Sequence, residues 1–125
     1  MDLDRQEAAL DELLRVAGVV YTEEADPRVA RLAEVQPLFP QYHRIGHKRQ
    51  AAVRALTADR ALAERCYAAA LRALLADEDP NSPRHLVEAL ARTVGGRRLA
   101  VDLGALREGG SEAEREAAAR ALHWL

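Results

Sequence analysis

Three stretches of this sequence pair a helix-capping residue with a short amphipathic run, a pattern typical of a helix start. Asp26 and Ser82 each stand directly before a proline, the residue best tolerated at the first position of a helix. Ser111 and Glu114 have the spacing of a capping box, in which each side chain satisfies a free backbone N–H. The recurrence of this pattern predicts a stack of short helices.

Apolar residues recur at helical spacing along almost the whole chain. The pattern predicts about seven short helices, at approximately residues 4–20, 26 to before 37, 41–56, 59–76, 83–94, 98–107 and 112–125. Residues 37–40 are expected to form an apolar connector, because a proline disfavours the helical conformation of the residue before it. The glycine pairs at 95–96 and 109–110 are placed where left-handed helix C-caps are expected.

The segment 59–76 is the predicted centre of the fold. Its apolar residues, among them Leu62, Cys66 and Leu74, spread over more than half of the helix circumference. A helix of this kind has to pack on two sides, and its alanines would let the neighbouring helices approach closely. We therefore expect an all-α fold built around this helix.

The length of 125 residues suits one domain, so we predict a single all-α domain over residues 1–125. The net charge of -2 argues against a protein built mainly to neutralise a phosphate backbone. Cys66 is the only cysteine, which excludes an intrachain disulfide and favours a reducing compartment. Because neither a signal peptide nor a membrane-spanning apolar run is recognisable, we predict a cytoplasmic protein without a membrane partner.

Two segments near the C-terminus share a capped turn that leads into an Arg/Glu-rich helix ending in Ala-Leu, at residues 83–90 and 111–122. They resemble the first helices of HEAT-type repeats, and the resemblance covers about residues 81–125. It implies an α-solenoid-like scaffold whose surface binds another macromolecule, in a family without shared catalytic residues. An irregular helical bundle with the same local caps is the alternative fold.

His43 and His47 stand four residues apart, the spacing that lets two imidazoles on one helical turn bind a transition metal. If Ile45 points to the core, both histidines point away from it, on a stripe that offers no carboxylate or thiolate as a third ligand. A solvated polar face is the preferred interpretation, with a metal site as the alternative.

The segment 77–88 has a second candidate metal pattern. Asp77, Asp79, Asn81 and Glu88 occupy the first, third, fifth and twelfth places of a calcium-binding helix-loop-helix motif. However, Ser82 fills the sixth place, where the sharp turn of that motif uses glycine. We therefore expect no bound metal or cofactor, and keep this loop as an alternative site.

The densest positive cluster of the chain contains Arg44, Lys48 and Arg49 and extends to Arg54. Such a cluster could bind nucleic acid or an acidic protein surface. Tyr42 is the only aromatic residue nearby, so stacking on bases has little support. A nucleic-acid-binding module that uses this region remains an alternative, although we do not expect nucleic acid as the partner.

Groups suited to nucleophilic catalysis are scarce. The only serines, Ser82 and Ser111, stand at predicted helix starts, and Cys66 lies within the most apolar helix. No glycine-rich phosphate-binding loop precedes a helix. We therefore predict a protein-interaction or scaffold module rather than an enzyme.

The C-terminal helix offers a further interface candidate. Its apolar arc ends in Trp124 and Leu125, and in a solenoid part of that arc would face a following helix. Together with Arg44, Lys48 and Arg49, these two residues are the predicted contacts to a protein partner or to a second copy of the chain. Alternatively, Trp124 folds back as a cap onto one of the two preceding helices.

Overall fold

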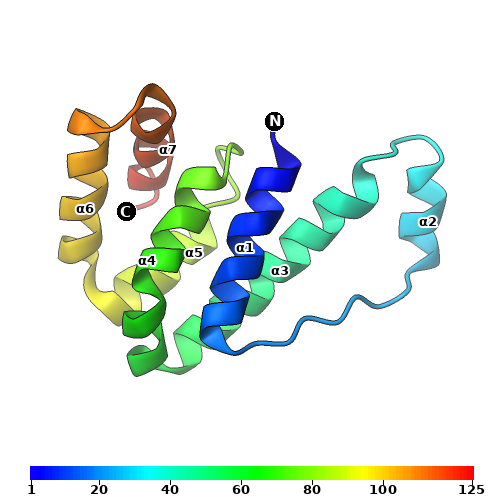
Figure 1. The fold of residues 1–125 in the computed structure, drawn as a ribbon, viewed down its shortest axis with the longest axis horizontal. Helices are drawn as coiled ribbons and strands as arrows, with labels where there is room; N and C mark the ends of the chain where they lie inside the picture. Colours follow the sequence, from blue (N-terminus) through cyan, green and yellow to red (C-terminus); the bar gives the residue numbers. More distant parts are fainter.

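The computed structural model describes all 125 residues and consists of helices and connecting segments without a β-strand. The helices are α1 (Leu3–Ala17), α2 (Pro27–Ala33), α3 (Phe39–Ala58), α4 (Arg60–Ala76), α5 (Arg84–Leu90), a π-helical turn (Ala91–Gly95), α6 (Gly96–Gly109) and α7 (Glu112–Leu122). The predicted all-α fold with about seven helices is confirmed (Figure 1). None of these helices has both the length and the apolar character that crossing a bilayer requires.

The core is built around α4, as the sequence predicts. Eight of its residues are buried: Ala63, Cys66, Tyr67, Ala69, Ala70, Ala73, Leu74 and Ala76. The helix packs against α1 on one side and against α5 and α7 on others. Alanines at these contacts allow the close approach of helix axes that dense packing needs.

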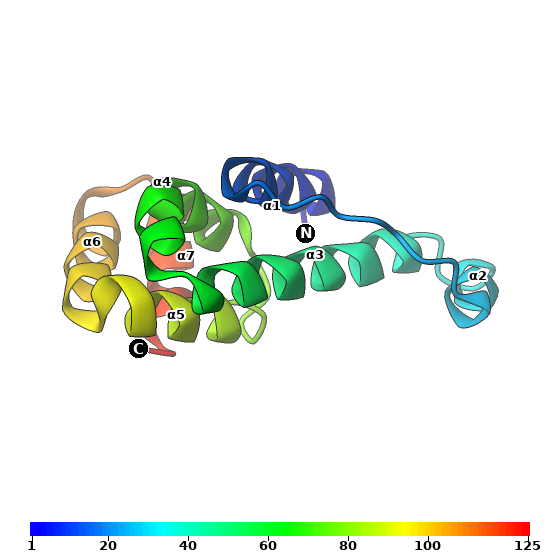
Figure 2. The same cartoon turned by 90° about the horizontal axis from the view of Figure 1, so that it is seen from below.

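Most of the remaining helices pack around α4, but α2 and the start of α3 extend away from this body (Figure 2). α1 packs along both α3 and α4, while α6 and α7 form an antiparallel pair (Figure 1). The long helix α3 extends away from this body, and α2 packs on its far end (Figure 2). No residue of α2 is buried. We call residues 27–42, which comprise α2, the following turn and the start of α3, the arm.

Two helix boundaries differ from the prediction. α1 ends at Ala17 instead of residue 20, because Gly18 adopts the left-handed conformation (φ 72°, ψ 24°) that glycine tolerates best. α3 begins at Phe39 and includes Pro40, so only residues 37 and 38 of the predicted connector lie outside a helix. A proline is accepted there because the first turn of a helix has free N–H groups in any case.

The predicted glycine caps after residue 94 and residue 108 are wrong in their conformation. Gly95 has a positive φ but extended ψ (116°, 133°), and Gly110 has a negative φ with extended ψ (-76°, 177°). Gly110 is needed for space instead, since a Cβ there would lie 2.6 Å from the Leu106 carbonyl oxygen and 2.9 Å from the Glu114 Cβ. Close packing between α6 and α7, rather than a left-handed turn, requires this glycine.

The predicted helix 83–94 is a short α-helix that continues as a π-helical turn. The Thr93 hydroxyl donates to the Ala89 carbonyl oxygen at 2.7 Å, and Arg60 Nε donates to the Thr93 carbonyl oxygen at 2.8 Å. Side-chain hydrogen bonds of this kind compete with the regular helical ladder and widen it locally. The sequence pattern did not indicate this turn.

The three predicted helix starts have different outcomes. Asp26 accepts from the Arg28 N–H, and the reciprocal capping box of Ser111 and Glu114 is present, so two caps are confirmed. Ser82 does not cap α5. Asp79 accepts from the Asn81 and Ser82 N–H groups instead, so the backbone of this loop is satisfied from within.

We expect Leu74→Ala to lower the free energy of unfolding by about 2–5 kcal/mol, because Leu74 is 1% exposed and its removal leaves a cavity beside α4. Urea unfolding followed by circular dichroism measures the loss. Val101→Ala is the matched control, since Val101 is 64% exposed on α6 and its change should be nearly neutral. Equal effects of the two substitutions would contradict the central role of α4.

Candidate interaction surface

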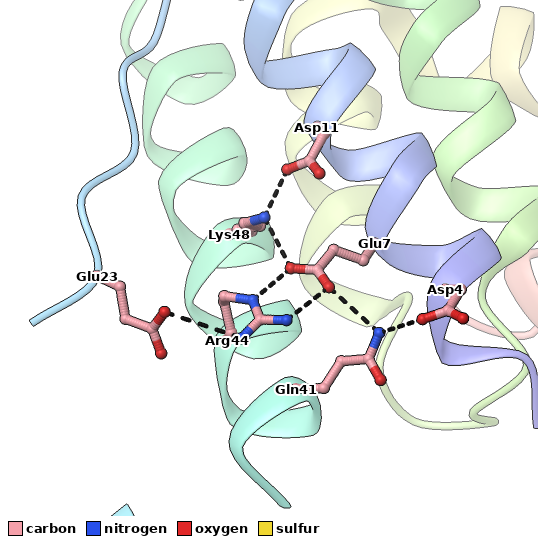
Figure 3. Close-up of polar contacts among 7 residues, drawn as sticks. All are labelled: Asp4, Glu7, Asp11, Glu23, Gln41, Arg44 and Lys48. Atoms are coloured by element: carbon pink, nitrogen blue, oxygen red, sulfur yellow. Dashed lines mark hydrogen bonds and ion pairs between the residues drawn. The ribbon is translucent and has the colours of Figure 1, made fainter. Parts of the chain in front are cut away.

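A cluster of charged side chains joins α1 to α3 (Figure 3). Glu7 accepts from Arg44 Nη2 at 2.9 Å and from Lys48 Nζ at 2.8 Å, and a second bond from Arg44 Nε makes the arginine contact bidentate. Lys48 Nζ also donates to Asp11 at 2.6 Å. Glu23, in the segment before α2, lies 3.8 Å from Arg44. We call Glu7, Asp11, Arg44 and Lys48 the α1–α3 clamp.

The clamp shifts the pKa values of its members. Hydrogen bonds from Arg44, and to a smaller extent from Lys48 and Gln41, lower the pKa of Glu7 to about 2 against the opposing effect of burial. Glu7 in turn raises the pKa of Arg44. Burial lowers the pKa of Lys48, but its bonds to Asp11 and Glu7 outweigh this and raise it overall. All three groups are therefore held in their charged forms at neutral pH.

Three residues of the predicted basic cluster form ion pairs within the fold, while Arg54 is exposed without one. The side chains of Arg44 and Lys48 are 28% and 11% exposed, in contact with acidic residues of α1. Arg49 Nη2 lies 3.4 Å from Asp77 Oδ2 and is 17% exposed. The charges of these three residues are therefore partnered within the fold by α1 and Asp77, and their role as contacts to a partner stays a prediction.

The predicted histidine pair lies on one face of α3. The ring centres of His43 and His47 are 4.2 Å apart, and Ile45 between them is buried, as the sequence predicts. His43 also lies beside Phe39, with ring centres 5.9 Å apart. No group of three or more His, Cys, Asp or Glu residues converges here or elsewhere in the chain. A third ligand would have to come from outside the chain.

The predicted calcium-loop ligands point to different partners. Asp77 accepts from the Asp79 N–H and faces Arg49, and burial raises the pKa of its carboxyl group. Asp79 caps the loop backbone, while Glu88 lies on α5 and accepts from Arg84 Nε at 3.0 Å. The carboxylates therefore do not surround a common point. The loop is a self-bonded turn that leads into α5.

Trp124 folds back onto the loop before α5. Its Nε1–H donates to the Pro80 carbonyl oxygen at 2.9 Å, and the Arg84 guanidinium lies 5.4 Å from the ring centre. The residue is half-buried against the core, whereas Leu125 is 44% exposed. This geometry favours the cap over the interface as the role of Trp124.

An apolar surface that the fold leaves uncovered lies between the arm and the start of α1. A groove of about 700 Å³ is lined by Met1, Leu3, Val35, Gln36, Pro37, Leu38, Phe39 and Tyr42. Val35 is 79%, Leu38 65% and Tyr42 51% exposed. Contiguous exposed apolar surface on a small protein marks an interaction site more often than chance exposure does. We call this feature the apolar groove.

The local sequence explains why these apolar residues stay outside. α2 ends at Ala33, and Pro37 prevents a continuous helix from α2 into α3. The Phe39 N–H donates to the Gln36 carbonyl oxygen at 2.9 Å, which closes a tight turn before α3. Leu38 lies in this turn and Val35 directly before it, and both side chains stay largely exposed.

One end of the apolar groove is acidic. A neighbouring hollow of about 560 Å³ shares Met1, Leu3 and Leu38 with the groove and is also lined by Asp2, Asp4, Gln41 and Glu78. The hydrogen bonds to these carboxylates come from neutral donors: the Arg5 N–H, the Gln41 side-chain amide and the Asp2 N–H. None of the three carboxylates is matched by a basic side chain within the fold.

Sequence reasoning identified residues 37–40 as an apolar connector but did not identify a binding surface there. The available signal was a run of apolar residues between two prolines, with no helical periodicity that would direct them into a core. The contribution of Leu3 and the acidic end could not be read from the sequence, because α1 and the arm are joined only by tertiary contacts.

Comparison with known proteins adds no relative. Protein-family models, curated proteins and solved structures give no match to this chain.

We expect the stability of the protein to depend on Glu7 at acidic pH. Because the pKa of Glu7 falls to about 2 in the folded state, its contribution is complete above about pH 5 and is lost as the pH falls towards 2. The Glu7 side chain is only 13% exposed, so this contribution is on the order of 2–3 kcal/mol.

The test is urea unfolding of the parent and of Glu7→Gln at a series of pH values. The gap in free energy of unfolding between them should be largest near neutral pH and should shrink on acidification. This difference isolates Glu7 from Asp77, whose raised pKa acts in the opposite direction. A gap that stays constant to about pH 2 would contradict the assigned ion pairs.

For Trp124 we expect a structural role. Trp124→Ala should lower the free energy of unfolding by about 2 kcal/mol, because it removes a hydrogen bond and partly buried aromatic contacts. Leu125→Ala serves as the control and should have little effect. Thermal melting and light scattering together decide the role: an unchanged melting temperature combined with loss of self-association would make Trp124 an interface residue instead.

Proposed function

We propose that this chain is a protein-interaction module and that the apolar groove is its binding surface. The observation that carries the proposal is the exposure of Val35, Leu38 and Tyr42 on one contiguous apolar surface. Burial of such surface by a partner is favourable by roughly 25 cal/mol for each Å² removed from water. The acidic end of the groove would orient the partner and exclude those with a matching negative charge.

The arrangement of the charged groups supports a protein rather than a nucleic acid as the partner. Three basic residues of α3, Arg44, Lys48 and Arg49, are already paired with Glu7, Asp11 and Asp77, which leaves Arg54 as the one exposed cation of the cluster without an ion pair. Apolar surface next to unpaired carboxylates would repel a phosphate backbone. A HEAT-type scaffold is a compatible form of the same proposal, and the antiparallel pair of α6 and α7 supports it.

The test is affinity capture from a lysate of the source cells with the parent chain and two variants. Leu38→Asp places a charge in the groove at a turn position that is 65% exposed, so the fold should be retained. Val101→Asp places the same charge on α6, at a position that is 64% exposed and outside the groove. Circular dichroism verifies that all three chains are folded.

We expect specific proteins, identified by mass spectrometry, to bind the parent and Val101→Asp but not Leu38→Asp. Loss of binding follows because a desolvated, unpaired charge in an apolar interface costs several kcal/mol. If all three chains retain the same proteins, the groove is not the binding surface and the proposal is wrong.

A further inference from the structure

We propose that the apolar groove binds the arm of a second copy of this chain, in a dimer with two-fold symmetry. The inference rests on the proposed function of the groove and names its occupant. It follows from three features of the arm and the groove: the absence of any buried residue in α2, the charges at the two ends of the surface, and the exposed apolar residues between them.

α2 is poorly supported within one copy of the chain. It has seven residues, and none of them is buried. Helices this short are marginal in water, since most helical stability in proteins comes from packing of an apolar face. Leu32 is 44% and Val35 is 79% exposed on the arm. A surface that covers these two residues would supply the packing that the isolated copy lacks.

The charges of the arm match those of the groove. Arg28 and Arg31 lie on α2; the side chain of Arg28 is 80% exposed, 3.4 Å from Asp26, and Arg31 is exposed without an acidic partner. At the other end of the surface, Asp4 and Glu78 have neutral hydrogen-bond donors only. The arm therefore carries one exposed cation without an ion pair, Arg31, beside the exposed Glu34, and the start of α1 carries carboxylates without basic partners.

The placement of these ends suits a two-fold axis. α2 packs on the far end of α3, away from the start of α1 (Figure 1). The acidic residues lie at the start of α1, and Leu38, in the turn between α2 and α3, lines both the acidic hollow and the apolar groove. A two-fold axis near Leu38 sets α2 of each copy against the start of α1 of the other. Every contact then occurs twice, as in an isologous dimer. To bind the groove in the same way, a different protein would need an apolar face next to a basic residue, which the arm of a second copy already has.

The test is sedimentation analysis over a concentration series, with the parent and charge-reversal variants. We expect the parent to dimerise, and Arg31→Glu and Asp4→Lys each to weaken the dimer by tenfold or more, because each substitution opposes two like charges twice. An equimolar mixture of the two variants should recover dimerisation as a heterodimer, since each copy then meets its opposite charge. Leu38→Asp should abolish the dimer, and Val101→Asp should leave it intact.

Two results would overturn the inference. If the parent stays monomeric up to millimolar concentration, a second copy is not the occupant of the groove. If other proteins are still captured by the parent but not by Leu38→Asp in that case, the groove binds a different partner, and the proposed function stands while this inference fails. A dimer that survives Arg31→Glu, Asp4→Lys and Leu38→Asp has its contacts elsewhere, for example near Trp124. Circular dichroism of every variant separates loss of association from loss of fold.

Discussion

The bidentate contact between Glu7 and Arg44, with Lys48 beside it, fixes how α1 lies along α3. Because these groups are largely buried, each charge depends on the others: removal of one partner leaves an uncompensated charge at a cost of several kcal/mol. Once α1 is held in this register, Leu3 faces the turn that carries Leu38. The apolar groove therefore depends both on the clamp, which places Leu3, and on the arm, which supplies Leu38.

The clamp also decides the character of the surface. It holds the side chains of Arg44 and Lys48 against α1, so these two residues contribute little positive charge to the exposed surface. What remains exposed at this end is the apolar turn and a set of carboxylates without basic partners. A surface of this composition favours a partner with an apolar face and a basic end, and the arm itself meets that description.

The sequence predicts correctly those features that depend on residues close together in the chain. The caps at Asp26 and Ser111 form as predicted, since a cap needs only a side chain and an N–H two or three residues away. The buried character of α4 follows from its periodicity. Two helix boundaries were predicted wrongly. The apolar periodicity extends the first helix to residue 20, but α1 ends at Ala17 before the left-handed Gly18. Pro40 was expected in a connector, but it lies in the first turn of α3. The π-helical turn at Ala91–Gly95 contains Thr93, whose hydrogen bonds with Ala89 and Arg60 cannot be read from the periodicity of the sequence.

The sequence alone determined the all-α class, the central helix and most helix starts, because these depend on residues within one or two turns of each other. Only the tertiary structure decided the electrostatics and the exposed surface. Arg44 and Glu7 are 37 residues apart in the chain, and Asp2 and Glu78 are 76 residues apart, yet each pair is joined by hydrogen bonds. Whether Arg44, Leu38 or Trp124 faces solvent depends on which distant element packs against it, and that information arises only when the helices assemble.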